Sequence, residues 1–126
     1  MNTKFIMTAS AIAMGAVGIG LTFLPEEVAT VIGLPAEGKI ILQITGALYF
    51  GFAMVNWMSK ANLIGGIYNR PVAVGNMAHF LIAALALLKH SPKSPVLIAV
   101  AIVYSIFAIA FSSILFIHPV KDSKTE

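Results

Sequence analysis

The sequence predicts an all-α polytopic membrane protein, a four-transmembrane-helix up-down bundle with short loops. Of its 126 residues, 59% are hydrophobic and only 10% are charged, whereas a soluble domain carries about 25% charged residues. Four segments contain no Asp, Glu, Lys or Arg, namely residues 5–25, 40–59, 71–88 and 94–120. Each is long enough to cross a hydrocarbon core of about 30 Å at about 1.5 Å per residue. This composition excludes an ordinary soluble enzyme, a disordered chain and a nucleic-acid binder.

The four apolar segments are expected to be helices of one transmembrane domain, residues 1–126. Only helices and closed barrels satisfy their backbone in lipid, and the period-two alternation of barrel strands is absent. The expected helices cover about residues 4–24, 38–58, 71–89 and 95–117, with a frayed tail at 121–126. The first is longer than the roughly 7–15 apolar residues of a signal peptide, which favours a retained helix.

A short interfacial helix is predicted over residues 26–33. Pro25 suits the first turn of a helix, and Glu26 and Glu27 would face the positive end of its dipole. Gly33 and Pro35 would end it. An irregular loop is the alternative.

Lys and Arg are unevenly distributed between the two sides of the predicted membrane. Four helices place both termini on one side, and cytoplasmic loops carry an excess of positive residues. The side with the termini holds five, and the other side holds three: Lys4, Lys60, Arg70, Lys121 and Lys124 against Lys39, Lys89 and Lys93. The prediction is an inner-membrane, multi-pass protein with both termini in the cytoplasm.

Small residues predict which helix faces pack closely, because membrane helices approach each other through them. The predicted packing residues are Thr8, Ala11, Gly15, Gly18 and Thr22 in the first helix, Ala47 and Gly51 in the second, and Ala101, Ser105, Ala108 and Ser112 in the fourth. In the third helix, Gly75, Asn76, His79, Ala83, Ala86 and His90 are expected to face protein, and Met77, Leu81, Leu85 and Leu88 are expected to face lipid.

His79 is the ionisable residue closest to the middle of a predicted span, and such residues suggest function. It could contact a ligand, carry protons or bind a metal. Alternatively, it is a neutral imidazole that bonds a neighbouring helix beside Asn76. Haem between helices needs a second inward histidine at matching depth, whereas His90 and His118 lie near helix ends. No metal or cofactor is therefore expected.

Five polar residues form the candidate ligand-binding set: Tyr49, Asn56, Asn76, His79 and Ser105. If their depths align, they could hold a lipophilic molecule with one polar end, or they could be interhelical bonds. Arg70 follows Gly65-Gly66 and could hold a lipid phosphate, with an ordinary turn as the alternative. Gln43 lies on a different helix face from Asn56 and could face a second subunit.

No Asp or Glu lies within the four segments, and ion-coupled transport usually depends on such a carboxylate. No catalytic constellation is visible either. The leading expectation is a non-enzymatic accessory or structural subunit of a membrane assembly. The alternative is a binder of a lipid-like or quinone-like molecule, or an uncoupled small transporter, built around His79. The expected partners are membrane lipids and either further copies of the chain or a larger membrane complex, and no nucleic acid.

Several short motifs resemble a family of small bacterial four-helix membrane proteins for which no activity is established. They are Pro25-Glu26-Glu27, Gly33-Leu34-Pro35, residues 43–51, Asn56-Trp57-Met58, residues 65–71 and residues 76–80. The resemblance covers about residues 25–89. It implies a bacterial inner-membrane location and draws attention to Tyr49, Asn56, Arg70, Asn76 and His79, without assigning them roles.

Overall fold

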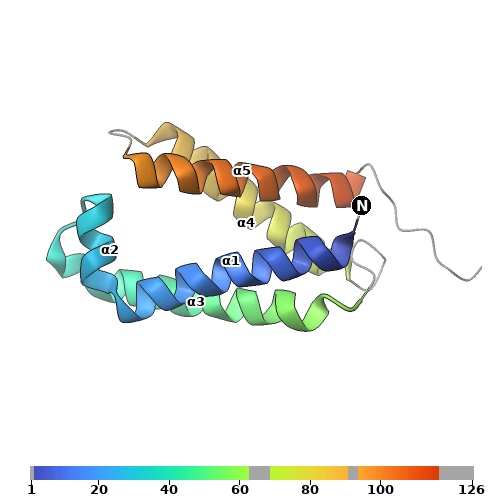
Figure 1. Cartoon of the computed structure of the whole chain (residues 1–126), viewed down its shortest axis with the longest axis horizontal. Coiled ribbons are helices and arrows are strands. Elements are labelled where there is room, and N and C mark those ends of the chain that lie inside the picture. Colours follow the sequence, from blue (N-terminus) through green and yellow to red (C-terminus); the bar gives the residue numbers. More distant parts are fainter. Residues whose placement is uncertain (1, 63–68, 91–93, 117–126) are drawn as a thin grey trace, which may run out of the picture. The chain divides into compact units, whose positions relative to one another are not determined.

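The computed structural model describes residues 2–62, 69–90 and 94–116, and its regular structure is helical (Figure 1). The elements are α1 (Thr3–Phe23), α2 (Pro25–Ile32), the 3-10 turn η1 (Ala36–Gly38), α3 (Lys39–Ser59), α4 (Arg70–Lys89) and α5 (Pro95–Phe116). The four long helices α1, α3, α4 and α5 are long and apolar enough to cross a membrane. The predicted all-α class with four membrane helices is confirmed. The tail at 121–126 lies outside the described residues.

The chain forms two compact units, and each is described by itself. One spans Met7–Met58, and we call it the α1–α3 unit. The other joins Met1–Ile6 to Ser59–Glu126, and we call it the α4–α5 unit. The prediction of a single domain stays a prediction.

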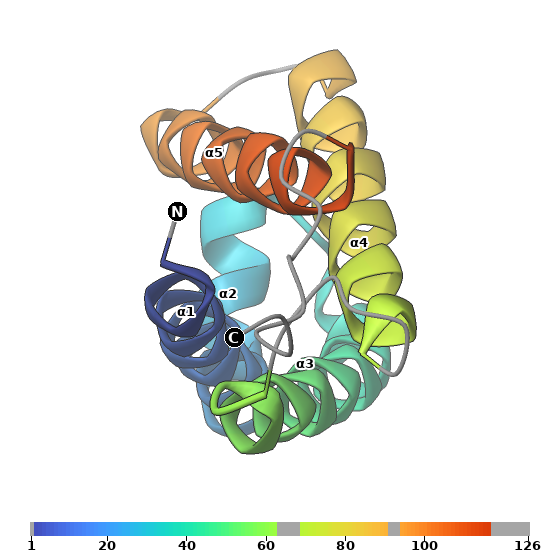
Figure 2. The same cartoon turned by 90° about the vertical axis from the view of Figure 1, so that its right-hand side faces the viewer.

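In the α1–α3 unit, the two long helices run side by side and antiparallel (Figures 1 and 2). The order of the contacts shows the antiparallel arrangement, because residues nearer the C-terminal end of α1 contact residues nearer the N-terminal end of α3. The contacting pairs, in order along α1, are Ser10 with Asn56, Gly15 with Ala53, Gly18 with Phe50 and Gly46, and Thr22 with Gln43. Gly18 and Gly46 are both buried, and their backbones nearly touch. Small residues at this point let the helices approach closely.

A short helix, α2, forms where the sequence predicted one rather than an irregular loop, and its position at the membrane interface stays a prediction. Pro25 occupies the first turn, and Gly33 ends the helix in the left-handed conformation, with φ of 73°. The amide of Gly33 donates to the Thr30 carbonyl at 3.3 Å and that of Leu34 to the Ala29 carbonyl at 2.8 Å. This pattern satisfies carbonyl groups at the helix end.

The apolar face of α2 packs on a small core of the α1–α3 unit. Ala29 is buried with Leu21 of α1 and Leu42 of α3, and Val28 and Ile32 pack against them. The short helix therefore covers the point where α1 ends and α3 begins.

In the α4–α5 unit, Phe80 joins the two helices. Its ring is fully buried and stacks on Phe107 and Phe111 at centroid distances of 4.8 and 5.8 Å, and it meets Tyr104 edge-on at 5.1 Å. The aromatic residues of α5 recur every three or four positions, so they lie along one face of that helix.

The structure corrects two predicted helix faces, each by about one residue. In α3, Gly46 and Ala53 are buried, whereas Ala47 and Gly51 are exposed. The buried residues of α4 are Ala73, Asn76, Phe80 and Ala84. Gly75, His79 and Ala83 are half-buried, and Ala86 and His90 are exposed. Burial of the large Phe80 ring turns the helix by about 100° from the predicted orientation.

Other predicted faces hold in whole or in part. Ala11 and Gly18 of α1 and Ala101 and Ala108 of α5 are buried. Thr8, Gly15, Thr22, Ser105 and Ser112 are half-buried. Leu81, Leu85 and Leu88 are exposed as expected for lipid contact, and Met77 is half-buried.

Candidate functional site

Asn56 is fully buried at the interface of α1 and α3. Its Nδ2 donates to Ser10 Oγ at 3.0 Å and lies 3.7 Å from Met14 Sδ. Ser10 Oγ in turn donates to the Met7 carbonyl at 2.9 Å. This chain of hydrogen bonds links two spanning helices, which is the interhelical role considered for Asn56. Sequence reasoning missed Ser10, whose signal was its place between Met7 and Met14 on one helix face.

Tyr49 lies in a different environment from Asn56. It packs against the core of Leu21, Ala29 and Leu42, close to α2. Tyr49 and Asn56 share a helix face, but they are about two turns apart. Within the α1–α3 unit the two residues therefore contact different neighbours rather than one common centre.

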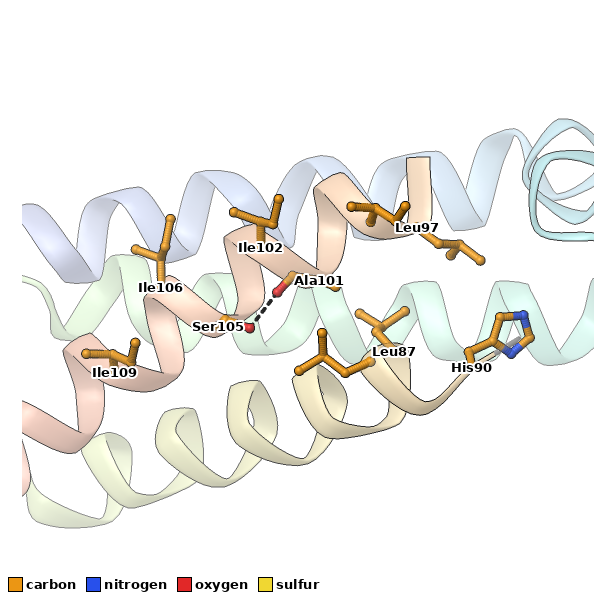
Figure 3. Close-up of a pocket in the computed structure, with 10 residues that line it drawn as sticks. Leu87, His90, Leu97, Ala101, Ile102, Ser105, Ile106 and Ile109 are labelled. Carbon is orange, nitrogen blue, oxygen red and sulfur yellow. Dashed lines mark hydrogen bonds between the residues drawn. The ribbon is translucent and has the colours of Figure 1, made fainter. Parts of the chain in front are cut away.

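Asn76 and Ser105 hydrogen-bond to the backbone of their own helices. Asn76 Nδ2 donates to the Val72 carbonyl at 2.9 Å. Ser105 Oγ donates to the Ala101 carbonyl at 2.7 Å, as the dashed line in Figure 3 shows. Bonds of this kind satisfy a polar group inside an apolar helix.

His79 is half-buried among aromatic rings of the α4–α5 unit. Its ring lies 5.0 Å from that of Phe80, edge-on, and 5.6 Å from that of Tyr104. Its Nε2 atom is shielded from solvent. The ring contact with Tyr104 places His79 against α5, and both its bonding to a neighbouring helix and its ligand role stay predictions. Within the described ranges, no three His, Asp or Glu residues group as metal ligands.

A groove of about 390 Å³ lies between α4 and α5, within the α4–α5 unit (Figure 3). Such a volume falls within the range of small-molecule sites. Ser105 is the one predicted site residue that lines it, and His79 does not line it. The lining is Leu87, Leu88, His90, Leu97, Ile98, Ala101, Ile102, Ser105, Ile106 and Ile109. From Leu97 to Ile109 it follows α5 for about 18 Å at about 1.5 Å per residue.

A second cavity, of about 250 Å³, lies in the α1–α3 unit. We call it the α2–α3 corner; Glu26, Ala29, Thr30, Leu34 and Lys39 line it. Lys39 Nζ forms a hydrogen-bonded ion pair with Glu26 Oε1. The hydrogen bond and the charge of Lys39 lower the pKa of the Glu26 carboxyl below its ordinary value. The sequence indicated this corner only through two charged residues: Glu26 follows the first apolar segment, and Lys39 precedes the second.

Two further candidates have limited structural context. Arg70 is the exposed first residue of α4, and the preceding Gly65-Gly66 pair lies outside the described residues. Gln43 is exposed on α3, and its Nε2 donates to the Thr22 carbonyl at 3.4 Å. Phosphate binding by Arg70 and a subunit contact by Gln43 stay predictions.

The chain matches no known family, no curated protein and no solved structure. The resemblance to small bacterial four-helix membrane proteins therefore stays a prediction, and the functional argument depends on the chain's own geometry.

Proposed function

We propose that this chain is a non-enzymatic accessory or structural subunit of an assembly in the bacterial inner membrane. The observation that supports this role is how the polar side chains within the spans are used. Asn56 bonds Ser10 across two helices, and Asn76 and Ser105 bond their own helix backbones. The Asn56–Ser10 bond holds two helices together, which is a common use of polar residues in membrane interiors, and the other two bonds satisfy polar groups within their own helices.

The outward face of α3 offers a surface for another membrane helix. Ala47 and Gly51 are exposed, and no atom lies within 4 Å of a Cβ built on Gly51. Small residues on a lipid-facing surface let a partner backbone approach closely.

The test is the mass of the purified, tagged chain in mild detergent and in lipid nanodiscs. We expect a complex of fixed stoichiometry, which Gly51→Leu should weaken without changing the helical content. Gly20→Leu in α1 is the matched control, because a Cβ at Gly20 also meets no atom within 4 Å. A wild-type chain that is monomeric in both media would contradict the subunit role.

The proposed orientation has both termini in the cytoplasm. It is supported by the five Lys and Arg residues on the side of the termini against three on the other. A reporter that is active only in the cytoplasm, fused after Glu126, should be active. Activity of a periplasmic reporter at the same site would reverse the orientation.

The second candidate function is binding of a lipophilic molecule, and the groove between α4 and α5 supports it. Its walls are largely aliphatic, with His90 at one end and the Ser105 hydroxyl along its length. Native mass spectrometry should then detect a co-purifying lipid or quinone. Ile102→Trp, which fills the groove, should remove that molecule, whereas Ile82→Trp, on an exposed part of α4 away from the lining, should not.

A further inference from the structure

The α2–α3 corner lies where α1 gives way to α3, two helices that are long and apolar enough to cross a membrane. α1 ends at Phe23 and α3 begins at Lys39, and each of these helices has 21 residues. At about 1.5 Å per residue, a helix of that length spans the hydrocarbon core of about 30 Å. With α1 and α3 across the membrane, a cavity where α1 ends and α3 begins would lie among headgroups rather than acyl chains.

The corner presents one positive and one negative side chain to the same small cavity. The side chains of Lys39 and Glu26 are 44% and 68% exposed, so both charges are accessible to a ligand. Ala29 and Leu34 add apolar lining, and Thr30 adds a hydroxyl. A purely anionic ligand would be repelled by Glu26, and a purely cationic one by Lys39. The lining therefore favours a ligand that carries both charges.

We propose that the α2–α3 corner binds the headgroup of phosphatidylethanolamine, with the phosphate on Lys39 Nζ and the ammonium on the Glu26 carboxylate. A primary ammonium donates hydrogen bonds to a carboxylate, whereas the quaternary ammonium of phosphatidylcholine has no N–H to donate. Phosphatidylglycerol has the phosphate but no cation for Glu26.

Replacing the Lys39–Glu26 ion pair by contacts with the headgroup should cost little free energy. An exposed ion pair contributes little to stability, and each charge regains an opposite charge when the headgroup binds. Lys39 lowers the pKa of the Glu26 carboxyl, and on binding the headgroup ammonium would take the place of the Lys39 ammonium as the positive neighbour of that carboxylate.

The test uses the full-length chain, stripped of lipid in detergent, and native mass spectrometry. Phosphatidylethanolamine, phosphatidylcholine and phosphatidylglycerol with identical acyl chains are added in competition. We expect the first to be retained roughly two- to fivefold more than the other two, the factor that one exposed ion pair gives. Equal retention of the three lipids, or a preference for phosphatidylglycerol, would overturn the assignment.

Variants locate the preference at this corner. Glu26→Gln should abolish it, because the contact of the ammonium with Glu26 is what distinguishes the three headgroups. Lys39→Gln should instead weaken retention of all three lipids, because each carries a phosphate, whereas Lys39→Arg should keep both retention and preference. Glu27→Gln is the matched control, because Glu27 is exposed on the same helix turn but does not line the cavity. Melting temperatures measured beside the lipid data separate lost recognition from lost folding. A preference that survives Glu26→Gln, or retention that is unchanged in Lys39→Gln, would refute the site.

Soluble phosphoethanolamine distinguishes a lipid site from a site for a free small molecule. It should displace the lipid only in large excess, because it lacks the acyl chains that hold a lipid in the membrane. Displacement at equal concentration would refute the lipid assignment. The subunit role is measured separately, by the mass of the assembly, so either proposal can fail without the other.

Discussion

Replacement of Gly18 by alanine tests the closest approach of α1 and α3. A Cβ at this position would lie 2.8 Å from Phe50 N and 2.9 Å from Gly46 O, both backbone atoms. Favourable contacts of carbon atoms begin at about 3.5 Å, so the helices would have to separate locally by roughly 0.7 Å. No side-chain rotation relieves this overlap, because backbone atoms of α3 form the obstacle.

The expected magnitude combines two opposing effects. Overpacking in a well-packed interface costs about 1–3 kcal/mol, and backbone obstacles favour the upper part of that range. Alanine regains up to about 1 kcal/mol over glycine within a helix. Gly18→Ala should therefore lower the free energy of unfolding by roughly 1–2 kcal/mol.

Gly20→Ala, two residues away in the same helix, is the matched control. A Cβ at Gly20 meets no atom within 4 Å, so this variant should be neutral or more stable by up to about 1 kcal/mol. Both variants can be compared by reversible unfolding in mixed micelles with increasing sodium dodecyl sulfate, followed by circular dichroism. If Gly18→Ala were as stable as Gly20→Ala, the close helix contact deduced here would be refuted.

Four further outcomes are expected. A double-mutant cycle of Ser10→Ala and Asn56→Ala should give a coupling of about 0.6 kcal/mol, the average for hydrogen bonds between membrane helices; zero coupling would show that the bond is absent. Phe80→Ala should destabilise the chain by roughly 1–3 kcal/mol, less than in a soluble core because lipid is itself apolar, and Ile82→Ala, on the lipid-exposed side of α4, should change little by comparison. For the packing role of His79, His79→Gln should melt close to wild type and His79→Leu should cost roughly 1–3 kcal/mol; wild-type stability of His79→Leu would exclude that role. Lys39→Gln should raise the pKa of Glu26 in an NMR titration, and an unchanged pKa would show that the ion pair does not form. Because that pKa is lowered in the folded chain, the ion pair stabilises the fold above the unfolded-state pKa. This stabilisation is lost as the pH falls through the folded-state pKa.

The four long helices could be predicted from the sequence because one strong signal marks them. A segment that lacks charged residues and is long enough to cross the hydrocarbon core leaves few alternatives to a spanning helix. The short helix α2 was also predictable, since Pro25 and Gly33 have conformational preferences that suit its two ends. The groove between α4 and α5 had no such signal, because its lining residues are the aliphatic residues found on any lipid-facing surface.

The helix faces were harder to predict because lipid removes the usual contrast between a polar outside and an apolar inside. In α3, Gly46 and Ala47 are both small and adjacent, and a rotation of about 100° exchanges them. The choice depends on the partner helix, since Gly46 packs where Gly18 brings the α1 backbone close. Similarly, α4 turns Phe80 rather than His79 inward, because Phe80 finds Tyr104, Phe107 and Phe111 along α5.

In the α1–α3 unit, the glycines and the polar residues contribute differently to the contact between α1 and α3. Gly18 and Gly46 determine how closely α1 and α3 approach, but two smooth surfaces would tolerate sliding along each other. The Ser10–Asn56 hydrogen bond opposes sliding, because a shift by one helix turn would separate its partners by about 5.4 Å and leave a buried amide without its serine. Asn56 thus selects the register near the end of α3, whereas Lys39 is the first residue of that helix and its side chain and that of Glu26 are exposed. A ligand of the Lys39–Glu26 pair could therefore bind without disturbing the contact between α1 and α3.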